Sequence, residues 1–247
     1  MNNAAIIIIG NEILSGRTLD QNANFLAKRC SDIGIIIDEI RIIPDVEKVI
    51  KKVVINASNN HKNVFVTGGI GPTHDDITAF SIAKAFNRRL ILNKKAKNLL
   101  ENHYKNSNFK LNDSRMKMAY IPARSSLIMN VVSSAPGFKI KNVWVMAGVP
   151  KIMQAMFIES VEPKLKKGKT IFAKTITVFK PEGDIAKILD KLNREYSLLE
   201  IGSYPFYKPP EIGTNIVLRS KNKKMIDLCV KKFSSLLKSK DIVFSLD

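Results

Sequence analysis

The chain has 247 residues, 45% of them hydrophobic and 25% charged, which suits one large folded domain or two smaller ones. No run approaches the roughly 20 apolar residues of a membrane span, and the apolar start lacks the preceding basic residue of a secretory signal. The net charge of +18 is spread over both halves, so attraction of a phosphorylated substrate, nucleic-acid binding and a generally lysine-rich composition all stay open.

Apolar runs and amphipathic segments alternate along the first two-thirds of the chain. The pattern predicts strands at residues 4–9, 35–43, 64–66, 90–92 and 143–146. It predicts helices at residues 20–33, 45–58, 77–86, 94–105 and 152–160, with Asp45 as the cap of the second. Such alternation indicates a mostly parallel sheet with helices on both faces. We therefore expect a three-layer α/β/α sandwich over residues 1–165.

The pattern breaks at residues 162–169, where we place a linker. Residues 170–247 then predict a second, small α+β domain. Its strands are expected at 171–179, 199–204, 214–219 and 242–244, and its helices at 182–196 and 221–237. The order βαββαβ is that of a ferredoxin-like domain.

The most informative segment is residues 67–78, Thr-Gly-Gly-Ile-Gly-Pro-Thr-His-Asp-Asp-Ile-Thr, between a predicted strand and a predicted helix. Its three glycines allow a ligand to approach the backbone, and N–H groups before a helix favour anions. The adjacent carboxylates of Asp75 and Asp76 would repel a bare phosphate, but a divalent cation between them would offset that charge. The alternative is that Asp76 only caps the helix. This loop is our candidate active site.

The loop is neither a P-loop, which needs Lys-Ser or Lys-Thr after its last glycine, nor a dinucleotide fingerprint. It resembles the TGG-x-GPT-x-DD-x-T signature of the molybdopterin-binding (MogA/MoaB-like) domain, in its CinA-type branch. Further segments match that branch in order: GNEILSG at 10–16, Asn22 with Leu26, APGF at 135–138 and GVP at 148–150. The similarity spans roughly residues 4–165.

The resemblance implies a phosphate-containing nucleotide or pterin ligand at the carboxyl edge of the sheet, where topology also places ligands. It implies that Asp75 and Asp76 hold Mg²⁺ or another divalent cation, and that Glu12 completes the metal shell or accepts a proton. Glu12 as a solvent-facing acid, and Asn22 as a helix-surface residue, are the alternatives. The substrate-binding residues it implies are Ser15, Asn22, Thr67, Gly68, Gly69, Gly71, Pro72, Thr73, Pro136, Gly137, Gly148 and Pro150.

CinA-type domains are similar to pyrophosphatases acting on ADP-ribose or FAD, whereas the MogA-like cousins adenylylate molybdopterin. We therefore expect a metal-dependent pyrophosphatase of a nucleoside diphosphate-linked substrate, with a molybdopterin-binding or adenylylating protein as the alternative. Asn11 and Ile152 replace acids of the family pattern, and Met146-Ala147 replaces Leu-Pro. The printed chain ends without the amidase domain of full-length CinA-type proteins, so we expect no deamidation of nicotinamide mononucleotide.

The remaining expectations concern surroundings and partners. Cys30 and Cys229 are predicted to be buried thiols of a cytoplasmic protein, with no zinc site. Nucleic-acid binding is a distant alternative, because the strands lack an aromatic-basic RNA-binding sequence. Residues 204–207, Tyr-Pro-Phe-Tyr, either stack a base or end a strand and pack between the domains. Relatives suggest a homo-oligomer whose second domain dimerises or docks.

Overall fold

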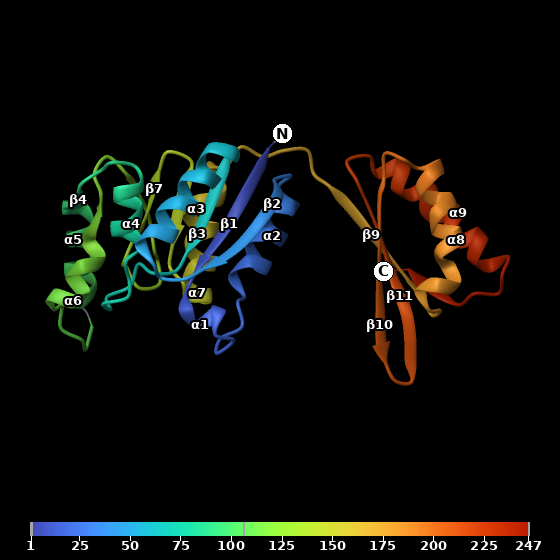
Figure 1. The fold of residues 1–247 in the computed structure, drawn as a ribbon, viewed down its shortest axis with the longest axis horizontal. Coiled ribbons are helices and arrows are strands. Elements are labelled where there is room, and N and C mark those ends of the chain that lie inside the picture. Colours follow the sequence, from blue (N-terminus) through green and yellow to red (C-terminus); the bar gives the residue numbers. More distant parts are fainter. Residues whose placement is uncertain (1, 106, 247) are drawn as a thin grey trace. The chain divides into compact units, whose positions relative to one another are not determined.

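The computed structural model describes residues 2–105 and 107–246. It divides the chain into two compact units, with the boundary between Gly168 and Lys169 (Figure 1). The first unit contains the glycine-rich loop, and each unit has a hydrophobic core of its own.

The first unit is built on a six-stranded sheet in the order β2-β1-β3-β8-β7-β6. The pairs formed by the first four strands are parallel, and those that add β7 and β6 are antiparallel. A separate antiparallel pair, β4-β5, lies outside this sheet. The strands are β1 (Asn3–Ile9), β2 (Ile36–Ile43), β3 (Asn63–Thr67), β4 (Leu90–Leu92), β5 (Tyr120–Pro122), β6 (Ser126–Ile128), β7 (Gly137–Ile140) and β8 (Val143–Met146).

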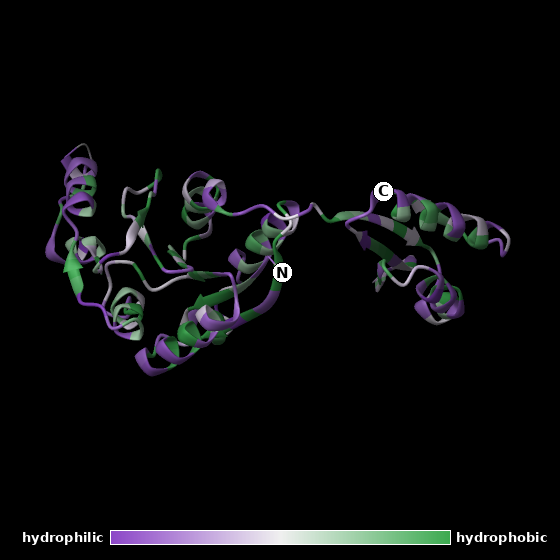
Figure 2. Cartoon of the chain, turned by 90° about the horizontal axis from the view of Figure 1, so that it is seen from above, coloured by the Kyte–Doolittle hydropathy of each residue, from purple (hydrophilic) through white to green (hydrophobic). Residues whose placement is uncertain are grey.

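Helices cover both faces of this sheet because its central strands are apolar on both sides. Along β1, Ala4, Ile6 and Ile8 pack with helices α2 and α7, whereas Ala5, Ile7 and Ile9 pack with α3 and α4. The central strands are accordingly hydrophobic in Figure 2, while the surrounding helices contain both hydrophobic and hydrophilic residues. The helical segments are α1 (Asn11–Leu14), α2 (Asn22–Asp32), α3 (Glu47–Asn60), α4 (Thr78–Ala85), α5 (Lys94–Lys105), α6 (Asp113–Met116), the 3₁₀ turn η1 (Lys117–Ala119), α7 (Pro150–Met156), the π-helical turn η2 (Phe157–Val161) and the 3₁₀ turn η3 (Glu162–Lys164).

The predicted α/β sandwich is confirmed, with three local differences. Helix α1 and strands β5, β6 and β7 were not predicted, since each is only three or four residues long. The helix after β8 begins at Pro150, two residues earlier than expected, because proline suits the first helical turn. Asp45 does not cap α3, whose N-terminus has no side-chain hydrogen bond.

The second unit has the predicted βαββαβ order. Its antiparallel sheet runs β10-β11-β9-β12, and two helices pack on one face of it through apolar residues such as Ile176, Leu192 and Phe233. The strand carrying residues 204–207 continues to Lys208, so those aromatics do not end it. The elements are β9 (Phe172–Val178), α8 (Glu182–Glu195), β10 (Glu200–Lys208), β11 (Glu211–Ser220), α9 (Lys223–Lys238) and β12 (Phe244–Leu246).

No helix in residues 2–105 and 107–246 is long and apolar enough to span a membrane. Both cysteines are buried free thiols. Burial raises the pKa of Cys30 to about 12 and that of Cys229 to about 11.

Candidate functional site

Three loops meet at the carboxyl ends of the adjacent parallel strands β1, β3 and β8. Together they line a cavity of about 660 Å³, which we call the acidic cavity. Gly10 and Glu12 come from the first loop, Gly68 to Pro72 from the second, and Ala147 to Pro150 from the third. This is the sheet edge that topology predicts for a ligand site, and the volume lies within the roughly 300–1,000 Å³ typical of cofactor pockets.

The loop after β3 depends on glycine because its backbone passes between β1 and α4. Gly68 has φ of +101°, and a Cβ there would lie 2.1 Å from the carbonyl oxygen of Ile9. Gly69 has φ of +66°, and its Cβ would lie 2.1 Å from Thr78 Oγ1. Larger residues would combine backbone strain with a collision at either position. The glycines therefore hold the loop against the sheet edge.

The N–H groups available to an anion are fewer than the sequence suggests. The Gly68 N–H donates to the Met146 carbonyl at 3.2 Å, and the Thr73 N–H donates to Asp76 Oδ2 at 2.8 Å. Among the described residues, the N–H groups of Gly69, Ile70 and Gly71 have no hydrogen-bond acceptor. These three consecutive donors are the part of the loop that can bind phosphate oxygens.

Thr73 connects the two aspartates of the loop. Its hydroxyl lies 2.5 Å from Asp75 Oδ1 and 2.6 Å from Asp76 Oδ2. A hydroxyl donates one hydrogen, so when it bonds to Asp75 the Thr73 N–H still donates to Asp76 Oδ2, and Thr73 can serve both carboxylates. The hydrogen bond from Thr73 lowers the pKa of Asp75, which keeps that group ionised at neutral pH.

Asp76 does not cap the following helix. Helix α4 begins at Thr78, its N-cap residue is Ile77, and no side chain bonds to its first turn. The Asp76 carboxylate instead points back along the loop to Thr73. Its hydrogen bonds therefore stabilise the loop, and the N-terminus of α4 has no side-chain cap.

Two further acids line the acidic cavity from the neighbouring loops. Glu12 places its carboxylate over the backbone of Gly10, where a Cβ would lie 2.5 Å from Glu12 Oε1. Asp45, which follows β2, accepts a hydrogen bond of 2.9 Å from the Asn11 N–H. Burial raises the pKa of Asp45, and the negative charges of Glu12, Asp75 and Asp76 raise it further against the opposing Asn11 hydrogen bond. The four acids thus form one electrostatic group.

The acidic cavity has no basic lining among the described residues, in a chain whose net charge is +18. Oxygen ligands of this kind suit Mg²⁺. No three acids, histidines or cysteines of the described chain converge into a ready-made metal cage. Mg²⁺ is commonly held by one or two carboxylates together with substrate phosphates and water, and the pair Asp75 and Asp76 fits that mode.

Asn22 lies behind the site rather than in it. Its side chain is 4% exposed, and Nδ2 donates to the Gly148 carbonyl at 2.7 Å and to Thr67 Oγ1 at 3.4 Å. Asn22 therefore ties α2 to the loops after β3 and β8. Thr67 is itself fully buried at the end of β3.

The other residues that the sequence suggested lie in four places. Gly148 and Pro150 line the acidic cavity. Ser15 does not line it, since its hydroxyl donates to the Glu12 carbonyl at the end of α1. Pro136 lines a smaller, neighbouring cavity. Gly137 packs in the sheet, where a Cβ would lie 2.1 Å from the Val145 carbonyl oxygen.

Sequence reasoning missed some of the lining. Asp45 was missed because an acid after a proline reads equally well as a helix cap. Asn130, which is 5% exposed, donates to Ser133 Oγ and to the Ala135 carbonyl and so shapes one wall of the cavity. The only sequence signal for Asn130 is its place five residues before the APGF match. Ile152, at a position where the family pattern has an acid, makes another wall apolar.

Comparison with known proteins identifies the family. Residues 5–167 match the family model described as a probable molybdopterin binding domain. The chain belongs to this family. Residues 170–245 match a second model, described as the middle domain of FAD synthase. The two matches cover the two units of the structure, and they connect this family member with nucleotide- or pterin-related function.

Relatives share both units of the chain. A protein of Archaeoglobus fulgidus is 39% identical over 95% of this chain and 98% of its own length. One from Pyrococcus furiosus is 30% identical over 98% of both chains. Among solved structures, CinA from Thermoplasma acidophilum, described as having unknown function, is 32% identical with a TM-score of 0.62. It covers 67% of this chain and 98% of its own, which confirms the CinA-type resemblance.

Proposed function

We propose that the first unit is a metal-dependent pyrophosphatase that cleaves a nucleoside diphosphate-linked substrate of the ADP-ribose or FAD type. One observation carries the proposal: the residues that line a single cavity include four acids and three whose backbone N–H groups have no acceptor, and none of the described lining residues is basic. The N–H groups suit phosphate oxygens, whereas the carboxylates oppose them. A site with both suits a phosphate that arrives together with a divalent cation.

The residues divide the task between binding and proton transfer. The N–H groups of Gly69, Ile70 and Gly71 would bind oxygens of the diphosphate. Thr73 fixes Asp75 and Asp76 beside each other, so that both can meet a cation with little rearrangement. A bound Mg²⁺ would supply neutralisation of phosphate charge and a more acidic water.

Asp45 is the best candidate for accepting a proton from the attacking water. Its pKa is raised by burial, and a carboxylate with a raised pKa is a stronger base than an ordinary one. It also lies on a different loop from the aspartate pair, so metal binding and proton transfer need not compete for one residue. Glu12 is the second acid placed for this role.

The size of the cavity and the family matches support a nucleotide substrate. About 660 Å³ accommodates most of a dinucleotide-sized molecule, and such a molecule carries the diphosphate that the loop suits. The match of the second unit to an FAD synthase domain supports substrates of the FAD type in particular.

The direct test is an activity screen on the full chain. ADP-ribose, FAD, NAD and CoA would each be supplied with Mg²⁺, Mn²⁺ or Co²⁺, and release of the adenine mononucleotide product would be measured. We expect turnover of at least one substrate that chelation with EDTA abolishes and added metal restores. No turnover of any of the four with any of the metals would refute the proposal.

The second candidate function is that of a molybdopterin-binding or adenylylating protein. It is favoured by the family match over residues 5–167. The same three N–H groups would then bind the terminal phosphate of the pterin. Equilibrium binding distinguishes the two: molybdopterin that binds no more tightly than inorganic phosphate would eliminate this candidate.

A further inference from the structure

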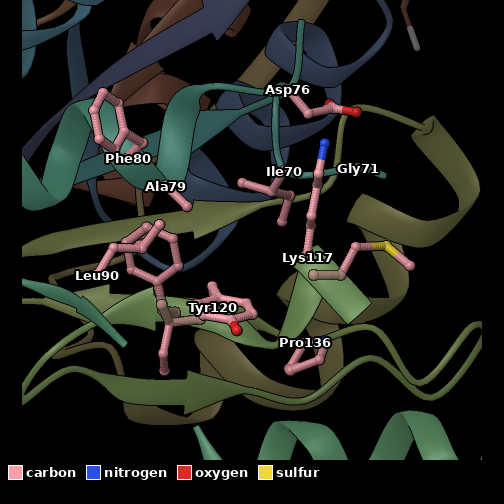
Figure 3. A pocket seen from close by; sticks show the side chains of 12 residues that line it. Ile70, Gly71, Asp76, Ala79, Phe80, Leu90, Lys117, Tyr120 and Pro136 are labelled. Atoms are coloured by element: carbon pink, nitrogen blue, oxygen red, sulfur yellow. The ribbon is translucent and has the colours of Figure 1, made fainter. Parts of the chain in front are cut away.

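A second cavity of about 270 Å³ lies beside the acidic cavity, and we call it the aromatic cavity. Its walls include Phe80 of α4, Tyr120 of β5 and Phe138 of β7, with Leu90 of β4 closing one side. Figure 3 shows the Phe80 and Tyr120 rings among its lining side chains. The walls are apolar apart from Asp76, Lys117 and the Tyr120 hydroxyl.

The two cavities are neighbours with a shared border. Ile70, Gly71, Asp76 and Met118 line both of them. Ile70 and Gly71 carry two of the three N–H groups assigned to phosphate, so a phosphate bound there lies at the border. A group attached to that phosphate can therefore extend into the aromatic cavity.

Two features of the aromatic cavity suit a flat, partly polar ring. Tyr120 is 39% exposed, so part of its ring is accessible to a ligand, whereas Phe80, 43% exposed, has the Lys84 amino group 4.2 Å from its ring centroid. At the border, the Lys117 amino group points toward Asp76 (Figure 3). Lys117 and the Tyr120 hydroxyl therefore supply polar groups to the cavity, while its aromatic walls offer rings for stacking.

We propose that the aromatic cavity binds the planar base of the nucleotide, as a subsite next to the phosphate-binding loop. This inference rests on the proposed function, because it takes the phosphate to lie at Gly69, Ile70 and Gly71. The volume, below the roughly 300–1,000 Å³ of whole-cofactor pockets, suits one purine-sized ring system. A base would also present hydrogen-bonding edges to the Lys117 amino group and the Tyr120 hydroxyl, which an aliphatic ligand lacks.

The test compares two ligands that differ only by the base. AMP and ribose 5-phosphate would be titrated calorimetrically into the full chain with Mg²⁺, with no requirement for turnover. The wild-type chain should bind AMP more tightly than ribose 5-phosphate. Since stacking on one aromatic side chain is typically worth 1–3 kcal/mol, Tyr120→Ala should weaken AMP binding by roughly 5- to 150-fold. Ribose 5-phosphate binding should change by less than about twofold.

Two further variants complete the test. Ala79→Leu fills the cavity without removing a ring and should reduce AMP binding selectively, as Tyr120→Ala does. Phe172→Ala removes a ring that is 38% exposed in the second unit and should leave both ligands unaffected. Thermal unfolding of each variant would establish that it is folded.

Three results would overturn the inference. They are equal affinity of the wild-type chain for AMP and ribose 5-phosphate, no measurable AMP binding, and parallel loss of both ligands in folded Tyr120→Ala and Ala79→Leu. An inactive enzyme that discriminates AMP from ribose 5-phosphate would refute the pyrophosphatase and keep the base subsite. An active enzyme without that discrimination would refute only the subsite.

Discussion

The substitution Asp76→Asn separates a catalytic role of the aspartate pair from a structural one. Asp76 Oδ2 accepts a hydrogen bond of 2.8 Å from the Thr73 N–H, and the Thr73 hydroxyl lies 2.6 Å from the same oxygen. An asparagine whose amide oxygen takes that place keeps the bond from the N–H and loses only the charge. Because charged hydrogen bonds exceed neutral ones by about 1 kcal/mol, the free energy of unfolding should fall by about that amount at most.

The expected loss of activity is much larger. A stability loss of about 1 kcal/mol lowers Tm by roughly 2–4 °C in a chain of this size. Removing a charge that a metal ion needs should reduce turnover on the order of 10²-fold or more, which corresponds to about 2.7 kcal/mol of activation free energy. The assay is the rate of AMP release at saturating substrate and Mg²⁺, measured beside a thermal unfolding curve.

Asp227→Asn is the matched control. Asp227 also accepts a hydrogen bond, of 2.9 Å from Lys174 Nζ, but it lies in the second unit outside the acidic cavity. Its loss should leave turnover at the wild-type level. If Asp76→Asn and Asp75→Asn both kept the wild-type rate at saturating Mg²⁺, the aspartate pair would have no part in metal binding, and Glu12 would become the acid to test.

The remaining predictions concern the loop, the border between the cavities and the thiols. Gly69→Ala should lower Tm at least twice as much as Gly16→Ala, because both glycines have positive φ but only Gly69 has an atom within 4 Å of the added Cβ. Thermal unfolding measures the two shifts in Tm, and equal shifts would contradict this prediction. Lys117→Gln should weaken AMP binding by up to about fivefold in calorimetry, since a hydrogen bond from a charged donor exceeds a neutral one by about 1 kcal/mol, and unchanged binding would place Lys117 away from the ligand. Cys30 and Cys229, with pKa values raised to about 12 and 11, should resist alkylation at pH 8 until guanidinium unfolds the chain, and fast alkylation of the native chain would contradict their burial. Because these folded-state pKa values exceed the unfolded value near 9, the free energy of unfolding should decline as pH rises above about 9.

Sequence patterns predicted the elements that are long and apolar. Strand β8 runs from Val143 to Met146 as predicted, and β1 differs from the prediction by one residue. These segments could be predicted because a buried parallel strand needs apolar side chains on both faces, which leaves a continuous run. Strand β7 has no such run: it begins at Gly137, alternates with Lys139 and pairs antiparallel with β8.

Within the site, the sequence located the loop but not the division of roles among its residues. Gly68 and Thr73 were predicted to bind the substrate through backbone or hydroxyl groups, but their N–H groups donate to the Met146 carbonyl and to Asp76. Asn22 holds Gly148 across 126 positions of sequence. Such contacts depend on how distant loops meet, and no local pattern records them. Asp45 shows the same limit, since only the fold turns it from α3 toward Asn11.

The net charge of the chain affects how a ligand approaches from solution, whereas the charge of the acidic cavity affects how the ligand binds. The net charge of +18 produces a long-range positive potential, which attracts an anionic diphosphate to the surface from solution. At the acidic cavity the sign reverses, because Glu12, Asp45, Asp75 and Asp76 oppose the same anion at close range. Near a protein surface each unit-charge pair at about 4 Å is worth about 4 kcal/mol, so a bare diphosphate would meet a large repulsion beside these acids. A cation that enters with the diphosphate removes most of that repulsion. Under the proposed function, the acidic cavity would therefore favour a metal–diphosphate complex over free phosphate and so select the substrate in its metal-bound form.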